Sequence, residues 1–238
     1  LRSEFAEVYG SLFRYSGNYV KVVRALATKA RGLTRNEVAK ASGITSGGGL
    51  TKILEELELS GFVRSCPNFS TNENLVLYQL IDFFSIFSLR FMQGAKPKNP
   101  RFWTRNQDDP ALSAWRGYAF ERICLLHAEQ IKKAIGVASI STETSSWRSR
   151  VSSPGAQIDL LIDRKDGVIN LCEDKYSHGV FTVTADYEKR LRNKLSVFEA
   201  ETGTKKAVHL TMVTTYGVKQ NRHVGLIQSE ATLDDLFA

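Results

Sequence analysis

The chain has 238 residues, 42% hydrophobic and 24% charged, which is the composition of a globular protein and argues against extensive disorder. Its 32 basic residues exceed its 25 acidic residues by seven, and residues 1–100 alone carry 13 basic against 8 acidic residues. A basic amino-terminal part indicates contact with a polyanion. The three cysteines are odd in number and flanked by apolar residues, which argues against a disulfide scaffold and favours a cytoplasmic location.

The most apolar run is too short to span a membrane, so we expect no membrane partner. It covers residues 80–92, is interrupted by Asp82 and Arg90, and predicts a buried helix. The chain begins with Leu1 directly inside an amphipathic pattern, and we therefore expect it to be part of a longer protein.

The first part of the chain predicts helices followed by a hairpin. Apolar spacing and turn residues predict, in chain order, helices at 5–13, 19–32, 34–41 and 50–59 and short strands at 62–63 and 75–78. Thr34 and Glu37 form a capping box at the start of the third helix, and Gly43 closes it. A polar tip at 68–74 joins the two strands.

This order of elements resembles a winged helix-turn-helix, most closely in the run GLTRNEVAKASGITSGGGLTKILEELELSGFVR. In that family the exposed side of the fourth helix can enter the major groove of DNA, which makes Lys52 a candidate DNA contact. The same face carries Glu55, Glu56 and Glu58, which would repel phosphate. A protein-docking role for this module therefore stays open.

A boundary between two domains is predicted near residue 100. The segment QGAKPKNP is short, basic and rich in proline and glycine, which is typical of a linker. We expect a winged helix over 1–92, a linker over 93–110 and a second domain over 111–238. The second domain predicts helices at 115–135 and 186–200, strands at 138–143, 156–163, 168–176 and 207–214, and a final strand and helix.

The fold class expected for the whole chain is α+β or α/β, with a mixed sheet flanked by helices in the second domain. Ala119, Ile123, Leu126 and Ile131 are expected to form the apolar side of its first helix.

The segment GAQIDLLIDRKDGVINLCEDKYS places charged residues inside apolar strands. Glu173 and Lys175 are two residues apart and therefore share one face of a strand, and Asp159 on the neighbouring hairpin strand can lie beside them. Carboxylates on apolar strands are costly to desolvate unless a cation balances them. A Mg²⁺ or Mn²⁺ ion would do so, and Lys175 could then orient an attacking water or stabilise the charge of a scissile phosphate.

An aspartate, a hairpin and then Glu-x-Lys resemble the PD-(D/E)XK nuclease superfamily, which includes restriction endonucleases and Holliday-junction resolvases. That family has a further glutamate on the helix before the sheet, and Glu121 in WRGYAFERICLLH matches it. The resemblance implies that Glu121, Asp159 and Glu173 bind metal and that Lys175, Glu173 and Asp159 are catalytic.

Two residues depart from this family pattern. Ile158 stands where a proline usually precedes the metal-binding aspartate, and Asp174 stands where an apolar residue usually separates Glu from Lys. Asp174 should point to the opposite face of the strand, where it needs a partner if that face is buried. A cluster inherited from a nuclease that no longer cuts DNA remains the alternative to an active site.

Further polar residues are candidates for holding nucleic acid. Gln157 shares the face of Asp159, Lys189 and Arg192 lie on the predicted helix at 186–200, and Lys219 lies in a later loop. They could follow a phosphate backbone, or the helix residues could form an ordinary solvated face.

Over nearly its whole length the chain is similar to the carboxy-terminal part of a family of bacterial and archaeal AAA+-type ATPases. The runs that carry this resemblance include EFAEVYGSLF, LYQLIDFFSIF and LTMVTTYGVKQN. The resemblance implies an ATP site in a preceding part of the protein and a homo-oligomer formed through it. The run GGGLTK lacks the Gly-Lys-Ser/Thr order of a phosphate loop, so we expect no ATP site in this chain. A regulatory module that binds DNA or protein for such an ATPase is the alternative to a nuclease.

Overall fold

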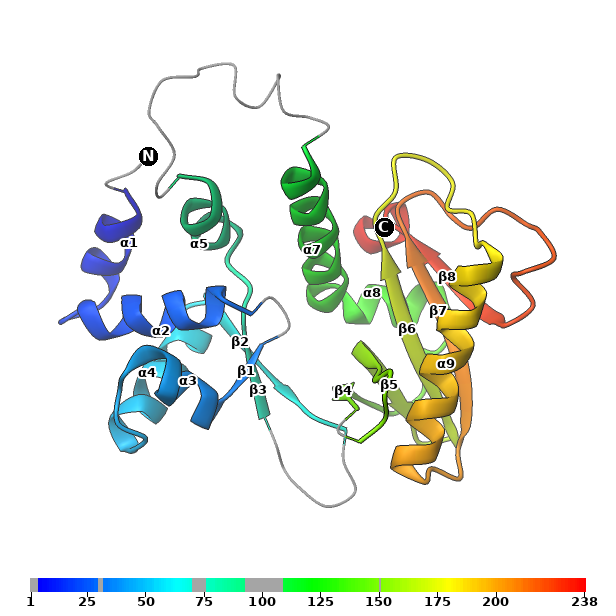
Figure 1. Ribbon diagram of the computed structural model, residues 1–238, viewed down its shortest axis with the longest axis horizontal. Helices are drawn as coiled ribbons and strands as arrows, with labels where there is room; N and C mark the ends of the chain where they lie inside the picture. The colour runs from blue at the N-terminus through cyan, green and yellow to red at the C-terminus, as the bar shows by residue number, and fades with distance from the viewer. Residues whose placement is uncertain (1–3, 30–31, 70–75, 93–108, 150) are drawn as a thin grey trace. The chain divides into compact units, whose positions relative to one another are not determined.

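The computed structural model describes residues 4–29, 32–69, 76–92, 109–149 and 151–238. These residues form two units (Figure 1): unit 1 takes the described residues of 1–66 and 75–108, and unit 2 those of 67–74 and 109–238. Each contains helices and a sheet, so the α+β class is confirmed. Residues 93–108 of the predicted linker and most of the predicted hairpin tip lie outside the described residues. In the described part no helix is both long and apolar enough to cross a membrane.

Unit 1 consists of helices around a small three-stranded sheet with the strand order β1-β3-β2. Its elements are α1 (Glu4–Leu12), α2 (Gly17–Ala27), β1 (Leu33–Thr34), α3 (Arg35–Ser42), α4 (Gly48–Leu59), β2 (Val63–Pro67), β3 (Val76–Leu80), α5 (Phe83–Phe87) and the π-helical turn η1 (Ser88–Met92). The apolar faces of these helices meet in one core, in which Tyr9, Val22, Leu50 and Leu57 are fully buried.

Two predictions for unit 1 need correction. The second helix ends at Ala27 rather than at Gly32, because the chain turns there into β1, whose Leu33 pairs with Tyr78. Gly32 has φ +92°, and a Cβ at this position would lie 2.8 Å from Cγ of Gln79, so the turn requires glycine. The apolar run at 80–92 is helical from Phe83, but most of its side chains are only half-buried.

Unit 2 is a mixed five-stranded sheet with helices on both faces. Its elements are α7 (Pro110–Leu126), α8 (Ala128–Ala134), β4 (Thr142–Arg148), β5 (Gln157–Arg164), β6 (Val168–Lys175), α9 (Ala185–Thr202), β7 (Ala207–Thr214), β8 (Ile227–Thr232) and the 3-10 turn η2 (Asp234–Phe237). The strands lie in chain order, with β4, β5 and β6 antiparallel and β6, β7 and β8 parallel.

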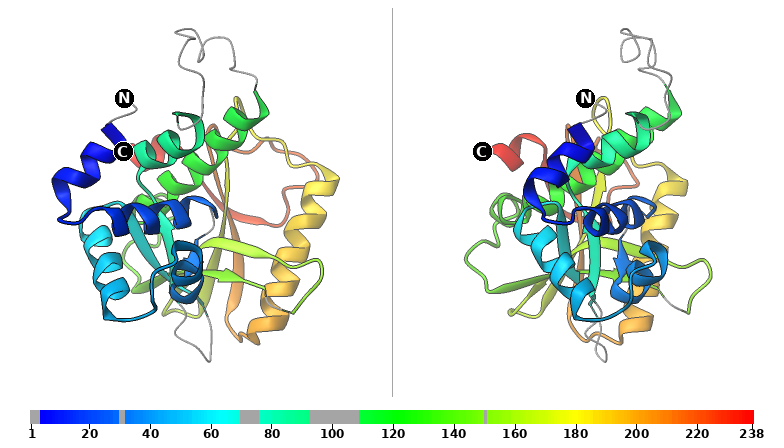
Figure 2. Two further views of the ribbon diagram at one scale, coloured as in Figure 1. Left: turned by 60° about the vertical axis from the view of Figure 1, so that its left-hand side comes forward. Right: turned by 90° about the vertical axis from the view of Figure 1, so that its left-hand side faces the viewer.

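Successive side chains along these strands point to opposite faces of the sheet, and each face forms its own hydrophobic core. Phe120, Cys124 and Ile131 of α7 and α8 pack on one face of the sheet, and Tyr187, Leu191 and Phe198 of α9 pack on the other. Figure 2 shows α7 and α9 on opposite sides of the strands. Any residue of β5 or β6 is therefore directed either toward α7 or toward α9.

Three details of unit 2 differ from the sequence predictions. The predicted strand at 138–143 is wrong in position, since β4 covers the polar stretch from Thr142 to Arg148. The helix predicted over 115–135 is two helices that meet at His127. The apolar face of α7 is turned by about one residue from the predicted one, because Phe120 and Cys124 are buried whereas Leu126 is 51% exposed.

The capping box of α3 is confirmed: the Glu37 backbone N–H donates to the Thr34 hydroxyl, and the Glu37 carboxylate accepts from the Thr34 backbone N–H at 2.8 Å. We expect Thr34→Ala to lower the free energy of unfolding by about 1 kcal/mol, because one backbone donor of the first turn loses its acceptor. Urea unfolding measures the loss. Thr45→Ala, at an exposed threonine in the turn between α3 and α4, is the control and should leave the midpoint unchanged.

The charge of Glu37 makes a second, pH-dependent contribution. The hydrogen bond from the Thr34 N–H holds the pKa of Glu37 below its usual 4.5, and Lys29 lowers it further. A lowered pKa in the folded state stabilises the protein above the unfolded pKa, and the contribution disappears as the pH falls through the folded value. Glu37→Gln should therefore cost about 0.5 kcal/mol or less at pH 7 and nothing near pH 3, as measured by urea unfolding at both values. An equal cost at both values would contradict this.

Candidate functional site

The four predicted nuclease residues all lie at one end of the sheet in unit 2. Leu160 of β5 pairs with Cys172 of β6, and Asp159 and Glu173 are the next residues beyond that pair. Lys175 ends β6, and α7 brings Glu121 from the neighbouring helix. The hairpin thus places the acids of β5 and β6 side by side because its register fixes which residues face each other.

Glu173 is the most strongly bound of these acids. Its side chain is 8% exposed and accepts hydrogen bonds from the Tyr187 hydroxyl at 2.6 Å on Oε1 and from Lys194 Nζ at 2.5 Å on Oε2. Lys175 Nζ lies 3.1 Å from Oε1. Burial alone would raise the pKa of Glu173, but the charges of Lys194 and Lys175 outweigh it, and the pKa lies below its usual value.

Glu121 and Asp159 complete the acidic group. Burial, together with the charge of Asp159, raises the pKa of Glu121 to about 7, and Lys175 acts in the opposite direction. These effects require that Glu121 lies within electrostatic range of both residues. Asp159 is half-buried and accepts a hydrogen bond from Gln157 Nε2 at 2.7 Å, so Gln157 positions the aspartate within the same strand.

Asp174 points to the opposite face of β6 from Glu173 and Lys175, as strand alternation predicts, and therefore toward α7, which also carries Glu121. It is 7% exposed, lies near Cys124 and Cys172 on the face toward α7, and neither of its carboxylate oxygens has a hydrogen-bond partner among the described residues. Burial raises its pKa well above the usual value. The face is buried and no described residue hydrogen-bonds Asp174, so it is a destabilising feature of this strand.

The donor set has the chemistry that a hard divalent cation prefers. Glu121 and Asp159 offer carboxylate oxygens, and within the described residues neither forms an ion pair with a basic side chain. Glu173, however, already uses both of its oxygens, and in the described part of the chain no three acidic, histidine or cysteine side chains are arranged to hold a metal ion.

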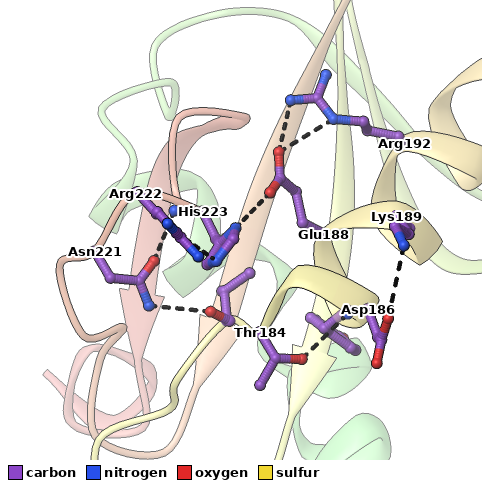
Figure 3. Close-up of polar contacts among 10 residues, drawn as sticks. Thr184, Asp186, Glu188, Lys189, Arg192, Asn221, Arg222 and His223 are labelled. Atoms are coloured by element: carbon purple, nitrogen blue, oxygen red, sulfur yellow. Dashed lines mark hydrogen bonds and ion pairs between the residues drawn. The ribbon is translucent and has the colours of Figure 1, made fainter.

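The predicted basic residues of α9, Lys189 and Arg192, lie against acids of the same helix (Figure 3). Arg192 donates to Glu188, whose second oxygen lies 2.7 Å from His223 Nδ1, and Lys189 lies 3.9 Å from Asp186. The backbone N–H of Lys219 donates to Phe181 while its side chain is exposed. Lys189, Arg192 and Lys219 are thus accessible on unit 2. The charges of Lys189 and Arg192 are partly neutralised by the neighbouring acids.

Lys52 lies on the exposed face of α4 in unit 1. Two of the acids near it have hydrogen-bond partners, so they would repel a phosphate less than the sequence indicates. Glu56 accepts a hydrogen bond from the Tyr19 hydroxyl and lies 3.9 Å from Lys52. Glu58 accepts from the backbone N–H and the hydroxyl of Ser65 and so ties α4 to β2. Both carboxylates thus have partners within unit 1, and Glu55 remains fully exposed.

Two residues of the site were not identified from the sequence, Lys194 and Tyr187. Both lie on α9 and bind Glu173. Their spacing of seven residues, which is two helical turns and places them on one face, is the signal that could have shown it.

Comparisons of the chain with protein-family models, with curated proteins and with solved structures give no match.

The neighbouring acids Glu173 and Asp174 should respond oppositely to the same substitution. Asp174→Leu removes a buried carboxylate that lacks partners and should raise the free energy of unfolding by about 1–3 kcal/mol. Glu173→Leu leaves Tyr187, Lys175 and Lys194 without their acceptor and should lower it by about 1–3 kcal/mol. Urea unfolding followed by the fluorescence of the buried Trp147 measures both. Equal destabilisation by both substitutions would show that Asp174 has a partner.

Proposed function

We propose that unit 2 is a divalent-metal-dependent phosphodiesterase that hydrolyses DNA. The observation that carries this proposal is the convergence of Glu121, Asp159, Glu173 and Lys175 from α7, β5 and β6 at one end of the sheet. Three carboxylates with one ammonium at the rim of a mixed sheet are the combination expected of the PD-(D/E)XK nuclease superfamily. The helix before the hairpin and the helix between β6 and β7 also agree with a nuclease-like sheet flanked by helices.

In this proposal Glu121, Asp159 and Glu173 hold Mg²⁺ or Mn²⁺. When bound, such a cation supplies an acidified water as the nucleophile and stabilises negative charge on the reacting phosphate. Lys175 is held by Glu173 Oε1 and lies 5.7 Å above the ring of Tyr187, while its side chain remains 32% exposed. It can therefore contact a phosphate without moving from its support. Gln157 keeps the Asp159 carboxylate in place.

Unit 1 is proposed as the winged helix-turn-helix that holds the DNA. The order α3, turn, α4 and then the strands β2 and β3 supports this interpretation, and α4 exposes Lys52 on its outer face. The hydrogen bonds of Glu56 and Glu58 within unit 1 weaken the argument that α4 repels phosphate. The resemblance to AAA+-type ATPases extends the proposal to an ATPase module of the same protein and to a homo-oligomer formed through that module.

Supercoiled plasmid incubated with the protein and Mg²⁺ or Mn²⁺ tests the hydrolytic proposal. We expect nicking or cutting that falls by about 10²-fold or more in Asp159→Ala, because a cation ligand is lost. Glu7→Gln, at an exposed acid of α1, is the matched control and should cut like the wild type. Intact plasmid at high protein concentration, with wild type and Asp159→Ala indistinguishable, would contradict the proposal.

The alternative function is a catalytically inactive nuclease-like domain that serves as a DNA- or protein-binding module of the ATPase. The observation that favours it is the ion pair of Lys194 with Glu173, which neutralises one of the three acids without a metal. In this case DNA should bind without being cut.

The binding alternative is tested by measuring DNA affinity against salt concentration. Binding should weaken steeply with salt, and Lys52→Ala should reduce the slope of log K against log salt by about one, because one phosphate contact is lost. Asp159→Ala should leave both affinity and slope unchanged. A slope that does not change in Lys52→Ala would exclude Lys52 as the phosphate contact.

A further inference from the structure

We propose that Lys194 is a second phosphate-binding cation of the site, which moves from Glu173 to a phosphate of the DNA when metal and DNA bind together. This inference rests on the proposed function and deepens it. It makes the metal and the phosphodiester cooperative ligands: each one binds better when the other is present.

The position of Lys194 on α9 is unusual for a lysine. Tyr187, Leu191 and Phe198 form the buried stripe of the helix, and position 194 falls on that stripe, one turn before Phe198. A side chain there is directed at the sheet, and Lys194 reaches Glu173 Oε2 at 2.5 Å. The helix thus presents a cation where its pattern calls for an apolar residue.

The contacts of Glu173 show what Lys194 would have to give up. Tyr187 and Lys175 both bind Oε1, so Lys194 is the partner of Oε2. A cation that binds Glu173 at Oε2 must replace the ammonium there, because the two positive charges would otherwise compete for one oxygen. Lys175 and Tyr187 can stay in place throughout, which separates their role from that of Lys194.

Burial indicates that Lys194 can move without unfolding the helix. Its side chain is 26% exposed whereas Glu173 is 8% exposed, so the ammonium lies on the solvent side of the pair. A lysine side chain has four rotatable carbon–carbon bonds, and its stem can keep its packing while the ammonium turns toward solvent. A phosphate of bound DNA would then replace the carboxylate as its partner.

The charges around Glu173 explain why the metal and the phosphodiester would bind cooperatively. Metal binding at Glu173 releases Lys194 and leaves an ammonium without an acid, which is unfavourable next to a divalent cation. A phosphodiester supplies the missing negative charge, and so favours the state with metal bound. Because such coupling is reciprocal, metal must strengthen DNA binding by the same factor by which DNA strengthens metal binding.

The test begins with Mn²⁺ alone, titrated into the full chain and followed by the electron paramagnetic resonance of the free ion. Lys194→Met keeps the stem of the side chain and removes the charge, so it should bind Mn²⁺ about tenfold more tightly than the wild type, within the usual range of coupling between sites. Lys194→Gln is a second variant with the same expected direction. Lys205→Met, at an exposed lysine just after the same helix, is the matched control and should bind Mn²⁺ like the wild type.

The second measurement is the affinity for a fluorescein-labelled DNA duplex, followed by anisotropy with and without Ca²⁺. In the wild type Ca²⁺ should tighten DNA binding about fivefold or more, and in Lys194→Met this factor should fall toward one. Lys205→Met should keep the factor of the wild type. The readout is the ratio of two affinities, so a general loss of phosphate contacts does not imitate the result.

Two outcomes would overturn the proposal, and they are distinguishable. If wild type and Lys194→Met bind Mn²⁺ equally well and Asp159→Ala abolishes the binding, the metal site stands but Lys194 does not compete for it. If neither the wild type nor any Lys194 variant binds Mn²⁺ while circular dichroism shows that they are folded, the metal site and the role of Lys194 fail together.

Discussion

A buried carboxylate is stable in a protein interior only when enough hydrogen-bond donors and positive charges replace the water that it has lost. Glu173 meets this condition through a tyrosine hydroxyl and two ammonium groups, supplied by its own strand and by α9. The position of Lys175 and the packing of the first half of α9 both depend on this carboxylate. The rest of the acidic group is arranged around it, since Asp159 comes beside it through the hairpin and Glu121 comes from the helix on the other face.

The next residue along the strand shows how closely this condition is tied to strand geometry. Asp174 is as buried as Glu173, but it is directed toward α7, where thiols and apolar side chains surround it and no described donor reaches its oxygens. One step along β6 therefore separates a carboxylate held in the charged form from one driven toward the neutral form. A functional reason for Asp174 does not follow from its contacts.

Much of the fold was predictable from the sequence because its signals are local. The capping box at Thr34 and the strand from Ala207 to Thr214 depend on neighbouring residues and were predicted correctly. Strand β4 was misplaced because its polar sequence carries no strand pattern. It is held by pairing with β5, the next strand, and by a bridge from Asn68 to Ser146, which comes from a remote part of the chain.

The same distinction applies to the site. Residues two apart on one strand must share a face, so the grouping of Glu173 with Lys175 followed from spacing alone, and the register of a tight hairpin made Asp159 their neighbour. The partner of a lysine on a remote helix follows from no local rule, because it depends on how far α9 is rotated about its axis when it packs on the sheet. That rotation is set by Tyr187, Leu191 and Phe198, and once they are buried Lys194 is carried onto the sheet side as well. There the ammonium of Lys194 meets the carboxylate of Glu173 and neutralises a charge that the strand has buried.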